Sequence, residues 1–187
     1  ADRVTYIENY LMVKRDQEEP GYLSGDIINS ITGESLSGVQ YTVRKGWNNV
    51  TGEVVESGTA SYDYEIELLP GNYTLVATAD DFIESAMNVA IVSGEYTSQR
   101  ISLTPENVEM DGAYLTIVLT WGETPYDLDS HLIGPRSDNG TDIFHVYYSD
   151  KSAWENYEDM LANLDLDDTS SYGPETTTIV KLHTGLQ

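Results

Sequence analysis

From residue 21 onwards, hydrophobic positions alternate with polar ones over short stretches, as they do in half-buried β-strands. Val39, Tyr41 and Val43 show this pattern plainly, with one polar residue between each pair. Turn-forming residues such as Gly33 separate the stretches. The predicted strands are Tyr22–Ile28, Val39–Val43, Tyr62–Leu68, Thr74–Ala77, Asn88–Val92 and Gln99–Leu103. Short strands at intervals of about 8–12 residues are typical of a β-sandwich.

A second series of strands follows a predicted linker at 106–112, where Pro105 stops the last strand and acidic residues favour solvent. The strands predicted beyond the linker are Tyr114–Trp121, Leu128–Ile133, Asp142–Tyr148, Asn163–Asp168 and Thr176–Leu182. Between the third and the fourth, Ser152 and Glu155 fit the capping box of a helix. A short helix or a structured loop is expected there, with helical spacing between Trp154, Tyr157, Leu161 and Leu164.

The first nineteen residues follow a different period. Their apolar residues recur at the three- and four-residue spacing of an amphipathic helix: Tyr6, Ile7, Tyr10 and Leu11. Pro20 and Gly21 end this pattern. The chain is therefore predicted to be all-β apart from one short N-terminal helix at 1–19. Two β-sandwich domains of the immunoglobulin or transthyretin type are predicted, at 20–105 and 113–187.

Several spaced motifs in the first predicted sandwich agree in order with one known domain. Residues Gly25 to Val43 read G-x-I-x-x-x-x-T-G-E-x-L-x-G-V-x-Y-x-V, and Leu69 to Tyr73 read L-P-G-N-Y. An A-x-x-F motif and a closing Leu-Thr-Pro follow, at 79–82 and 103–105. This part of the chain resembles the carboxypeptidase regulatory-like domain. That domain is a transthyretin-like sandwich related to the CNA-B-like repeats of bacterial surface stalks. The resemblance implies a folding and spacing module, and it brings no catalytic residues.

The second predicted sandwich carries another set of motifs. Trp121 to Pro135 read W-G-x-x-P-x-D-L-D-x-H-L-x-G-P, and Tyr172 to Glu175 read Y-G-P-E. As a set they resemble an uncharacterised family of bacterial β-sandwich domains found in secreted or surface proteins. The resemblance implies no activity. Such domains continue for at least one more strand pair, so the second sandwich is expected to be incomplete at its C-terminal end.

Composition narrows the possible partners. The 187 residues include 32 acidic residues against nine Lys and Arg, which gives a formal net charge of −23. This charge repels nucleic acid and anionic membrane surfaces, so both are excluded as direct partners. It favours solubility, and it also suits multivalent cations. The absence of cysteine excludes disulfides, thiolate metal sites and cysteine nucleophiles. No apolar run approaches the roughly 18 residues of a membrane-spanning helix, so direct membrane insertion is not expected.

Acidic and histidine side chains recur at every second position in the second half of the chain. Asp127, Asp129 and His131 do so in one predicted strand, and Asp165 and Asp167 do so in another. Successive side chains of a strand point to opposite faces of its sheet. If these strands are neighbours, the polar groups gather on one face while leucines and aromatic residues form the core.

This polar face has four interpretations. Ca²⁺ binds about six to eight oxygens, and candidate ligands are Asp127, Asp129, Asp165, Asp167, Asp168 and Glu175. Zinc or another transition metal would use His131, His145 and Asp129. A pair of carboxylates is the third possibility, because such pairs hydrolyse glycosides. The fourth is structural: hydrated strand faces, aspartates at turns and hydrogen-bonded histidines.

We therefore predict a non-enzymatic module of a bacterial cell-surface or secreted protein, located outside the cell and without catalytic residues. The first domain would be a spacer. The second would be an adhesion or binding domain, organised by Ca²⁺, for an extracellular protein or glycan. The alternative is a carbohydrate-binding or accessory domain of a secreted hydrolase. An exposed Trp47 or Trp154 beside a groove would favour the alternative, and burial of both would count against it.

Overall fold

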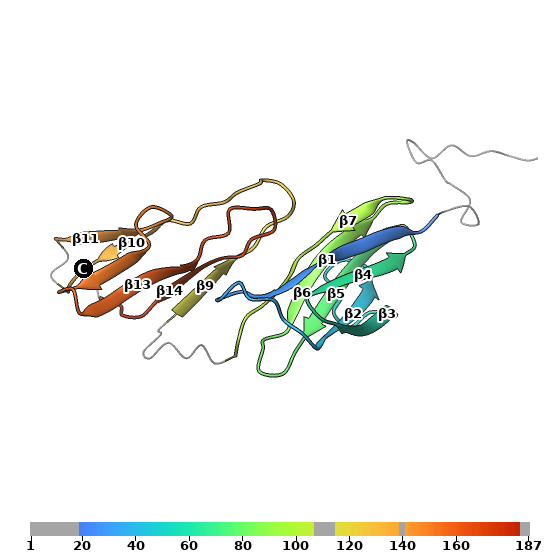
Figure 1. Ribbon diagram of the computed structural model, residues 1–187, viewed down its shortest axis with the longest axis horizontal. Helices are drawn as coiled ribbons and strands as arrows, with labels where there is room; N and C mark the ends of the chain where they lie inside the picture. Colours follow the sequence, from blue (N-terminus) through green and yellow to red (C-terminus); the bar gives the residue numbers. More distant parts are fainter. Residues whose placement is uncertain (1–18, 107–114, 139–140, 184–187) are drawn as a thin grey trace, which may run out of the picture.

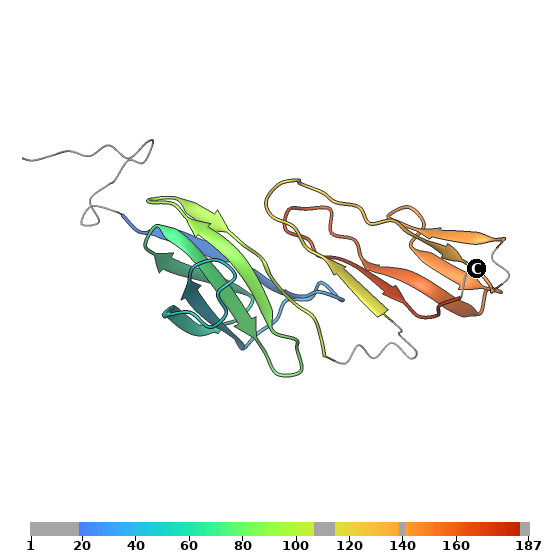
Figure 2. The ribbon, with the colours of Figure 1, turned by 180° about the vertical axis from the view of Figure 1, so that it is seen from behind.

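The computed structural model describes residues 19–106, 115–138 and 141–183, and in this part of the chain every regular element is a β-strand. The strands form two β-sandwich units that lie end to end along the long axis of the molecule (Figures 1 and 2). We call residues 19–106 the first unit and the described residues from 115 to 183 the second unit. The helix predicted at 1–19 falls on residues 1–18, outside the described residues. The described part of the chain contains no helix long and apolar enough to cross a membrane.

Two sheets form the first unit. In one, β1 (Gly21–Asn29) pairs with one antiparallel and two parallel strands, which are β4 (Asp63–Leu68), β7 (Tyr96–Ser98) and β8 (Ile101–Leu103). The other sheet has the order β3-β2-β5-β6. Its strands are β3 (Val54–Ala60), β2 (Val39–Lys45), β5 (Gly71–Thr78) and β6 (Ser85–Ile91).

Side-chain alternation explains the core of the first unit. In β4, Tyr64, Ile66 and Leu68 are buried, whereas Glu65 and Glu67 between them are exposed. Fully buried side chains from both sheets meet across the interior, among them Leu23, Ile27, Val39, Val43, Leu75, Ile101 and Leu103. Burial of side chains this size stabilises the fold by about 1.5–3 kcal/mol each.

The second unit is built on a four-stranded antiparallel sheet in the order β12-β13-β14-β9. Its strands are β12 (Ser152–Glu155), β13 (Asp159–Leu166), β14 (Glu175–Ile179) and β9 (Leu115–Leu119). A hairpin of β10 (Leu132–Pro135) and β11 (Ile143–Val146) packs on it. The core cluster is small, with Phe144, Val146, Ala153, Leu161, Ala162 and Leu164 buried. Leu115 and Ile117 on β9 remain 48% and 44% exposed, so the hairpin does not cover the whole sheet.

The predicted strands of the first unit match observed strands, but β3 and β7 were not predicted. The residues of β3 are mostly exposed on both faces, so this edge strand has no hydrophobic alternation to detect. In the second unit the strand predicted at Leu128–Ile133 begins only at Leu132. Asp127, Asp129 and His131 therefore do not lie on a regular strand face, and that part of the prediction was wrong.

The short helix considered for residues 152–164 is also wrong, because this segment forms the β12–β13 hairpin. Asn156 and Tyr157 have φ angles of 54° and 64°, which a right-handed helix does not allow. The side chains expected to form a capping box have other partners. The Ser152 hydroxyl donates a hydrogen bond to Asn163 Oδ1 at 2.7 Å, and Glu155 forms an ion pair with Lys181.

A single glycine tests the close packing of β1 in the first unit. A Cβ atom at Gly25 would lie 2.0 Å from the backbone carbonyl oxygen of Gln99, so Gly25→Ala must displace the strand. Overpacking of this kind costs about 1–3 kcal/mol, and we expect thermal unfolding followed by circular dichroism to show a midpoint lowered by several degrees. Gly122→Ala is the control, because nothing lies within 4 Å of its Cβ position. Equal midpoints for the two variants would contradict the close approach.

Candidate functional site

Three carboxylates converge at the end of the second unit that faces the first. Asp129, Asp167 and Glu175 each offer one oxygen, and these oxygens all lie within 4.8 Å of one another. Within the described part of the chain, this is the one group of three or more acidic or histidine side chains with such spacing. The side chains come from the loop before β10, the residue after β13 and the first residue of β14.

The pairing of β13 with β14 explains how Asp167 reaches Glu175. Leu166 is paired with Thr176, so the two acidic residues flank the point where the chain leaves one strand and enters the next. Gly173 helps to close the connection, because its φ of 67° lies in the left-handed region. A Cβ atom at this glycine would lie 2.5 Å from the Trp121 ring, so a side chain cannot fit without movement.

The loop before β10 brings Asp129 to the other two carboxylates. This loop runs beside the β13–β14 connection in both ribbon views (Figures 1 and 2). The backbone N–H of Ser130 donates a hydrogen bond to Glu175 Oε1 at 2.5 Å. The Ser130 hydroxyl also lies 3.3 Å from that of Thr177. These two contacts attach the loop to β14 immediately beside Asp129.

Burial makes the negative charge of this group costly. The Glu175 side chain is only 1% exposed, and its Oε2 atom has no hydrogen-bond partner. Asp167 Oδ1 is also buried without a partner, although Asp167 Oδ2 lies 2.7 Å from Lys151 Nζ. A buried polar atom without a partner destabilises a protein, and a buried carboxylate needs a compensating cation. One lysine beside three carboxylates leaves an excess of negative charge.

The other acidic candidates lie outside the group of three. Asp127 is exposed. Asp165 accepts a hydrogen bond from the Asn163 amide at 2.8 Å, and its second oxygen, Oδ2, is buried without a partner. Asp168 points towards the first unit and pairs with Arg100. The six residues selected from the sequence thus separate into three that converge and three that have other surroundings.

The two histidines selected from the sequence do meet, but at a different place from the carboxylates. His131 Nδ1 and His145 Nε2 lie 2.7 Å apart, and the Tyr147 ring stacks on both imidazoles. Asp129, the third ligand of the zinc interpretation, belongs to the carboxylate group instead. Among the described residues, neither histidine belongs to a group of three potential ligands with metal-site spacing.

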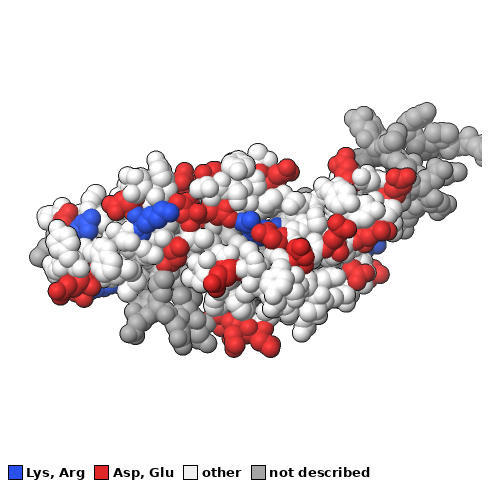
Figure 3. Space-filling view, viewed as in Figure 1, with Lys and Arg blue, Asp and Glu red and all other residues white. Residues whose placement is uncertain are grey.

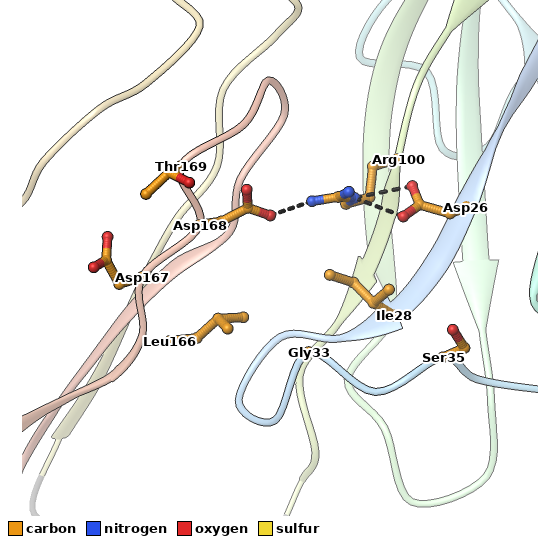
Figure 4. A pocket seen from close by; sticks show the side chains of 9 residues that line it. All are labelled: Asp26, Ile28, Gly33, Ser35, Arg100, Leu166, Asp167, Asp168 and Thr169. Atoms are coloured by element: carbon orange, nitrogen blue, oxygen red, sulfur yellow. Dashed lines mark hydrogen bonds and ion pairs between the residues drawn. The ribbon is translucent and has the colours of Figure 1, made fainter.

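Two basic residues near the carboxylates were missed by the sequence analysis. Lys151 pairs with Asp167, and Arg100 of the first unit lies between Asp26 and Asp168 (Figure 4). Burial disfavours the Arg100 charge, but hydrogen bonds and charges from both aspartates outweigh it and raise the Arg100 pKa. The sequence did offer one signal for them, which is that basic residues are scarce. Acidic side chains far outnumber basic ones along both units, so each basic residue is a candidate partner for carboxylates (Figure 3).

No protein-family model matches this chain, and no curated protein matches it in sequence. Its fold has distant likenesses among solved structures. The minor pilin GBS52 of Streptococcus agalactiae is 17% identical with a TM-score of 0.35, over 47% of this chain and 45% of the pilin. The Bacillus anthracis TIE protein is 12% identical with a TM-score of 0.39, over 89% and 32% of the respective chains.

A DUF3823 family protein from Parabacteroides merdae is 11% identical with a TM-score of 0.36, over 87% of this chain and 82% of that protein. The chain spans less than half the length of the pilin and of the TIE protein. Likenesses this distant carry no argument about function, which has to be inferred from the geometry of the site.

The carboxylate group leads to a prediction about the protein without divalent cations. In EDTA, Glu175→Gln is expected to raise the unfolding midpoint by a few degrees. The amide keeps the acceptor for Ser130 and removes one of three charges that repel one another by up to about 4 kcal/mol per pair. Asp127→Asn removes an equal charge from an exposed residue outside the group, so it is expected to change the midpoint little. A lower midpoint for Glu175→Gln would show that the charge is already compensated within the protein.

Proposed function

We propose that this chain is a non-enzymatic module of a bacterial cell-surface or secreted protein, with a spacer unit followed by a Ca²⁺-stabilised binding unit. The observation that carries the Ca²⁺ assignment is the buried Glu175 carboxylate, whose Oε2 atom has no partner and converges with oxygens of Asp129 and Asp167. The acidic cluster alone would be weak support. An unpartnered oxygen on a fully buried side chain within the cluster is a second, independent indication of a cation.

The spacing of the oxygens supports Ca²⁺. Each Ca–O bond is about 2.3–2.6 Å long, so two oxygens on opposite sides of the ion lie about 4.6–5.2 Å apart. The three oxygens of Asp129, Asp167 and Glu175 fall within this limit. Ca²⁺ accepts irregular sets of carboxylates, backbone carbonyls and waters, whereas Mg²⁺ demands a near-ideal octahedron. Asp129 is exposed, which leaves room for water to complete the coordination.

The same geometry argues against catalysis by the acidic group. A glycosidase needs two carboxylates on either side of a bond in a bound sugar. Glu175 is almost completely buried, so a sugar cannot approach it. Residues whose charge is inaccessible to a substrate are better suited to holding an ion than to transferring a proton.

An adhesive role is proposed on the arrangement of the units and on the two sequence resemblances. The units lie end to end, which suits a spacer that holds a binding domain away from an attachment point (Figure 1). The partner would be an extracellular protein or a glycan. We also propose that residues 21–105 form a carboxypeptidase regulatory-like domain and that the protein is located at the cell surface.

The alternative, a carbohydrate-binding or accessory domain of a secreted hydrolase, has one supporting observation. Trp47 and Trp154 are 58% and 39% exposed, and flat aromatic rings of this kind stack on sugars. Titration of soluble glycans with tryptophan fluorescence as the readout distinguishes the alternatives. Quenching that Trp154→Ala abolishes and Trp47→Ala leaves intact would assign a glycan site to the second unit. Unchanged fluorescence would favour a protein partner.

The Ca²⁺ assignment predicts a stability increase specific to this ion. At a free Ca²⁺ concentration of 100 times the dissociation constant, an ion that binds only the folded protein adds about 2.7 kcal/mol. Scanning calorimetry in CaCl₂ is therefore expected to show a midpoint about 5–10 °C higher than in EDTA. Asp129→Asn combined with Glu175→Gln is expected to abolish the rise, whereas Asp127→Asn is expected to keep it.

A Lys151 variant provides a second test of the Ca²⁺ assignment. The Lys151 ammonium group competes with a cation for Asp167, so Lys151→Met is expected to increase Ca²⁺ affinity in a calorimetric titration. The absence of any shift with CaCl₂ would refute the assignment. A shift with ZnCl₂ alone that His131→Ala abolishes would replace it with the histidine site.

A further inference from the structure

At each end of the β13–β14 connection, a residue of the proposed ion site is followed directly by a residue that contacts the first unit. Asp167 belongs to the carboxylate group, and the next residue, Asp168, pairs with Arg100 of the first unit. Glu175 belongs to the same group, and the hydroxyl of the next residue, Thr176, donates a hydrogen bond to the carbonyl oxygen of Ser30 at 2.5 Å. Neighbouring side chains of an extended segment point in opposite directions, which explains this division.

Arg100 is the centre of the contact between the two units. Its Nε atom lies 2.9 Å from Asp26 Oδ1 within the first unit. Its Nη1 atom donates one hydrogen bond to Asp168 Oδ2 (Figure 4). It donates another to the carbonyl oxygen of Gly173, so it contacts both ends of the connection in the second unit. One guanidinium group therefore binds both ends of the segment that also carries Asp167 and leads into Glu175.

These polar contacts join two units whose hydrophobic cores are separate. A pocket of about 350 Å³ lies between them, beside Arg100, and its lining includes Ile28, Leu166 and Asp167 (Figure 4). The two core clusters contain no residue from the opposite unit. Interfaces between domains that lack a large apolar contact permit relative motion.

We infer that the Ca²⁺ site is part of the junction, so that binding of the ion fixes the orientation of the second unit relative to the first. This inference rests on the proposed function, because it requires an ion at Asp129, Asp167 and Glu175. Without the ion, repulsion among the three carboxylates spreads the β13–β14 connection. Its two ends then no longer fit the Arg100 guanidinium. With the ion, the connection closes and presents Asp168 and Gly173 together.

Coupling of this kind is reciprocal. If Ca²⁺ strengthens the contact of Arg100 with the second unit, loss of that contact weakens Ca²⁺ binding by the same factor. Arg100→Gln is therefore expected to reduce Ca²⁺ affinity at least fivefold, although Arg100 is not a proposed ligand. Arg136→Gln is the matched control. It removes the same charge from a residue that pairs with Asp142 within the second unit.

The orientation itself is measured by single-molecule energy transfer on the full chain. The protein has no cysteine, so Glu65→Cys and Tyr157→Cys introduce two unique labelling positions, both exposed and one in each unit. We expect a broad distribution of transfer efficiencies in EDTA and a narrow one in CaCl₂. In the labelled Arg100→Gln variant we expect a broad distribution in both conditions. Thr176→Val, which removes the other contact, provides a second variant if Arg100→Gln does not fold.

The outcomes separate this inference from the proposed function. If CaCl₂ raises the unfolding midpoint but leaves the transfer distribution unchanged, the ion stabilises the second unit alone and the coupling is overturned. Equal Ca²⁺ affinities for Arg100→Gln and the unmodified protein would also overturn it. If CaCl₂ changes neither midpoint nor distribution, the proposed Ca²⁺ site itself fails.

Discussion

The buried charge of Glu175 is the constraint on which the second unit depends. This residue begins β14, a strand that is buried along its whole length and otherwise consists of three threonines and an isoleucine. A neutral residue would satisfy such a position at lower cost, because a carboxylate loses its hydration there. Its Oε1 atom accepts a hydrogen bond from the loop before β10, and its Oε2 atom converges with Asp129 and Asp167. The carboxylate thus connects the loop before β10 with the end of β13 and the start of β14, and the proposed cation shared among them would turn repulsion into attachment.

The small core explains why such an attachment matters. Fourteen buried hydrophobic residues form the main cluster of the first unit, but only six form that of the second. Leu115 and Ile117 stay half-exposed on β9, and the β10–β11 hairpin covers only part of the sheet. Apolar burial is the main stabilising term in most domains, and a unit with little of it depends more on ions, hydrogen bonds or partners. In this unit the three convergent carboxylates lie at the end that meets the first unit, whereas the ion pairs of Glu155 with Lys181 and of Arg136 with Asp142 lie elsewhere.

Local patterns predicted the fold better than they predicted the site. Alternation in β4 revealed its buried face because Tyr64, Ile66 and Leu68 all face one core, whereas β3 lies at an edge and has no such face. Helical spacing at 152–164 was misleading because Asn156 and Tyr157 adopt positive φ angles, which turn the chain into a hairpin. The spacing of hydrophobic residues carries no information about such angles. Asp129 and Asp167 were selected on the premise of neighbouring strand faces. The structure brings them together by a loop and a strand end instead. The scarcity of basic residues could draw attention to Arg100, but its pairing with Asp168 depends on where the two units meet, which no local pattern shows.

The acidic composition and the junction are parts of one electrostatic problem. Two acidic units placed end to end repel each other, and with only nine Lys and Arg in the chain few side chains can offset that repulsion. Arg100 supplies one positive charge at the contact and is already shared between Asp26 and Asp168. The proposed divalent cation would add two more charges close by, because its ligand Asp167 is next to Asp168 and its ligand Glu175 is two residues after Gly173. Burial at this place limits screening by salt. Screening weakens repulsion between exposed charges but acts less on buried ones. The proposed cation at this junction would therefore offset a repulsion that salt in the surrounding solution leaves in place.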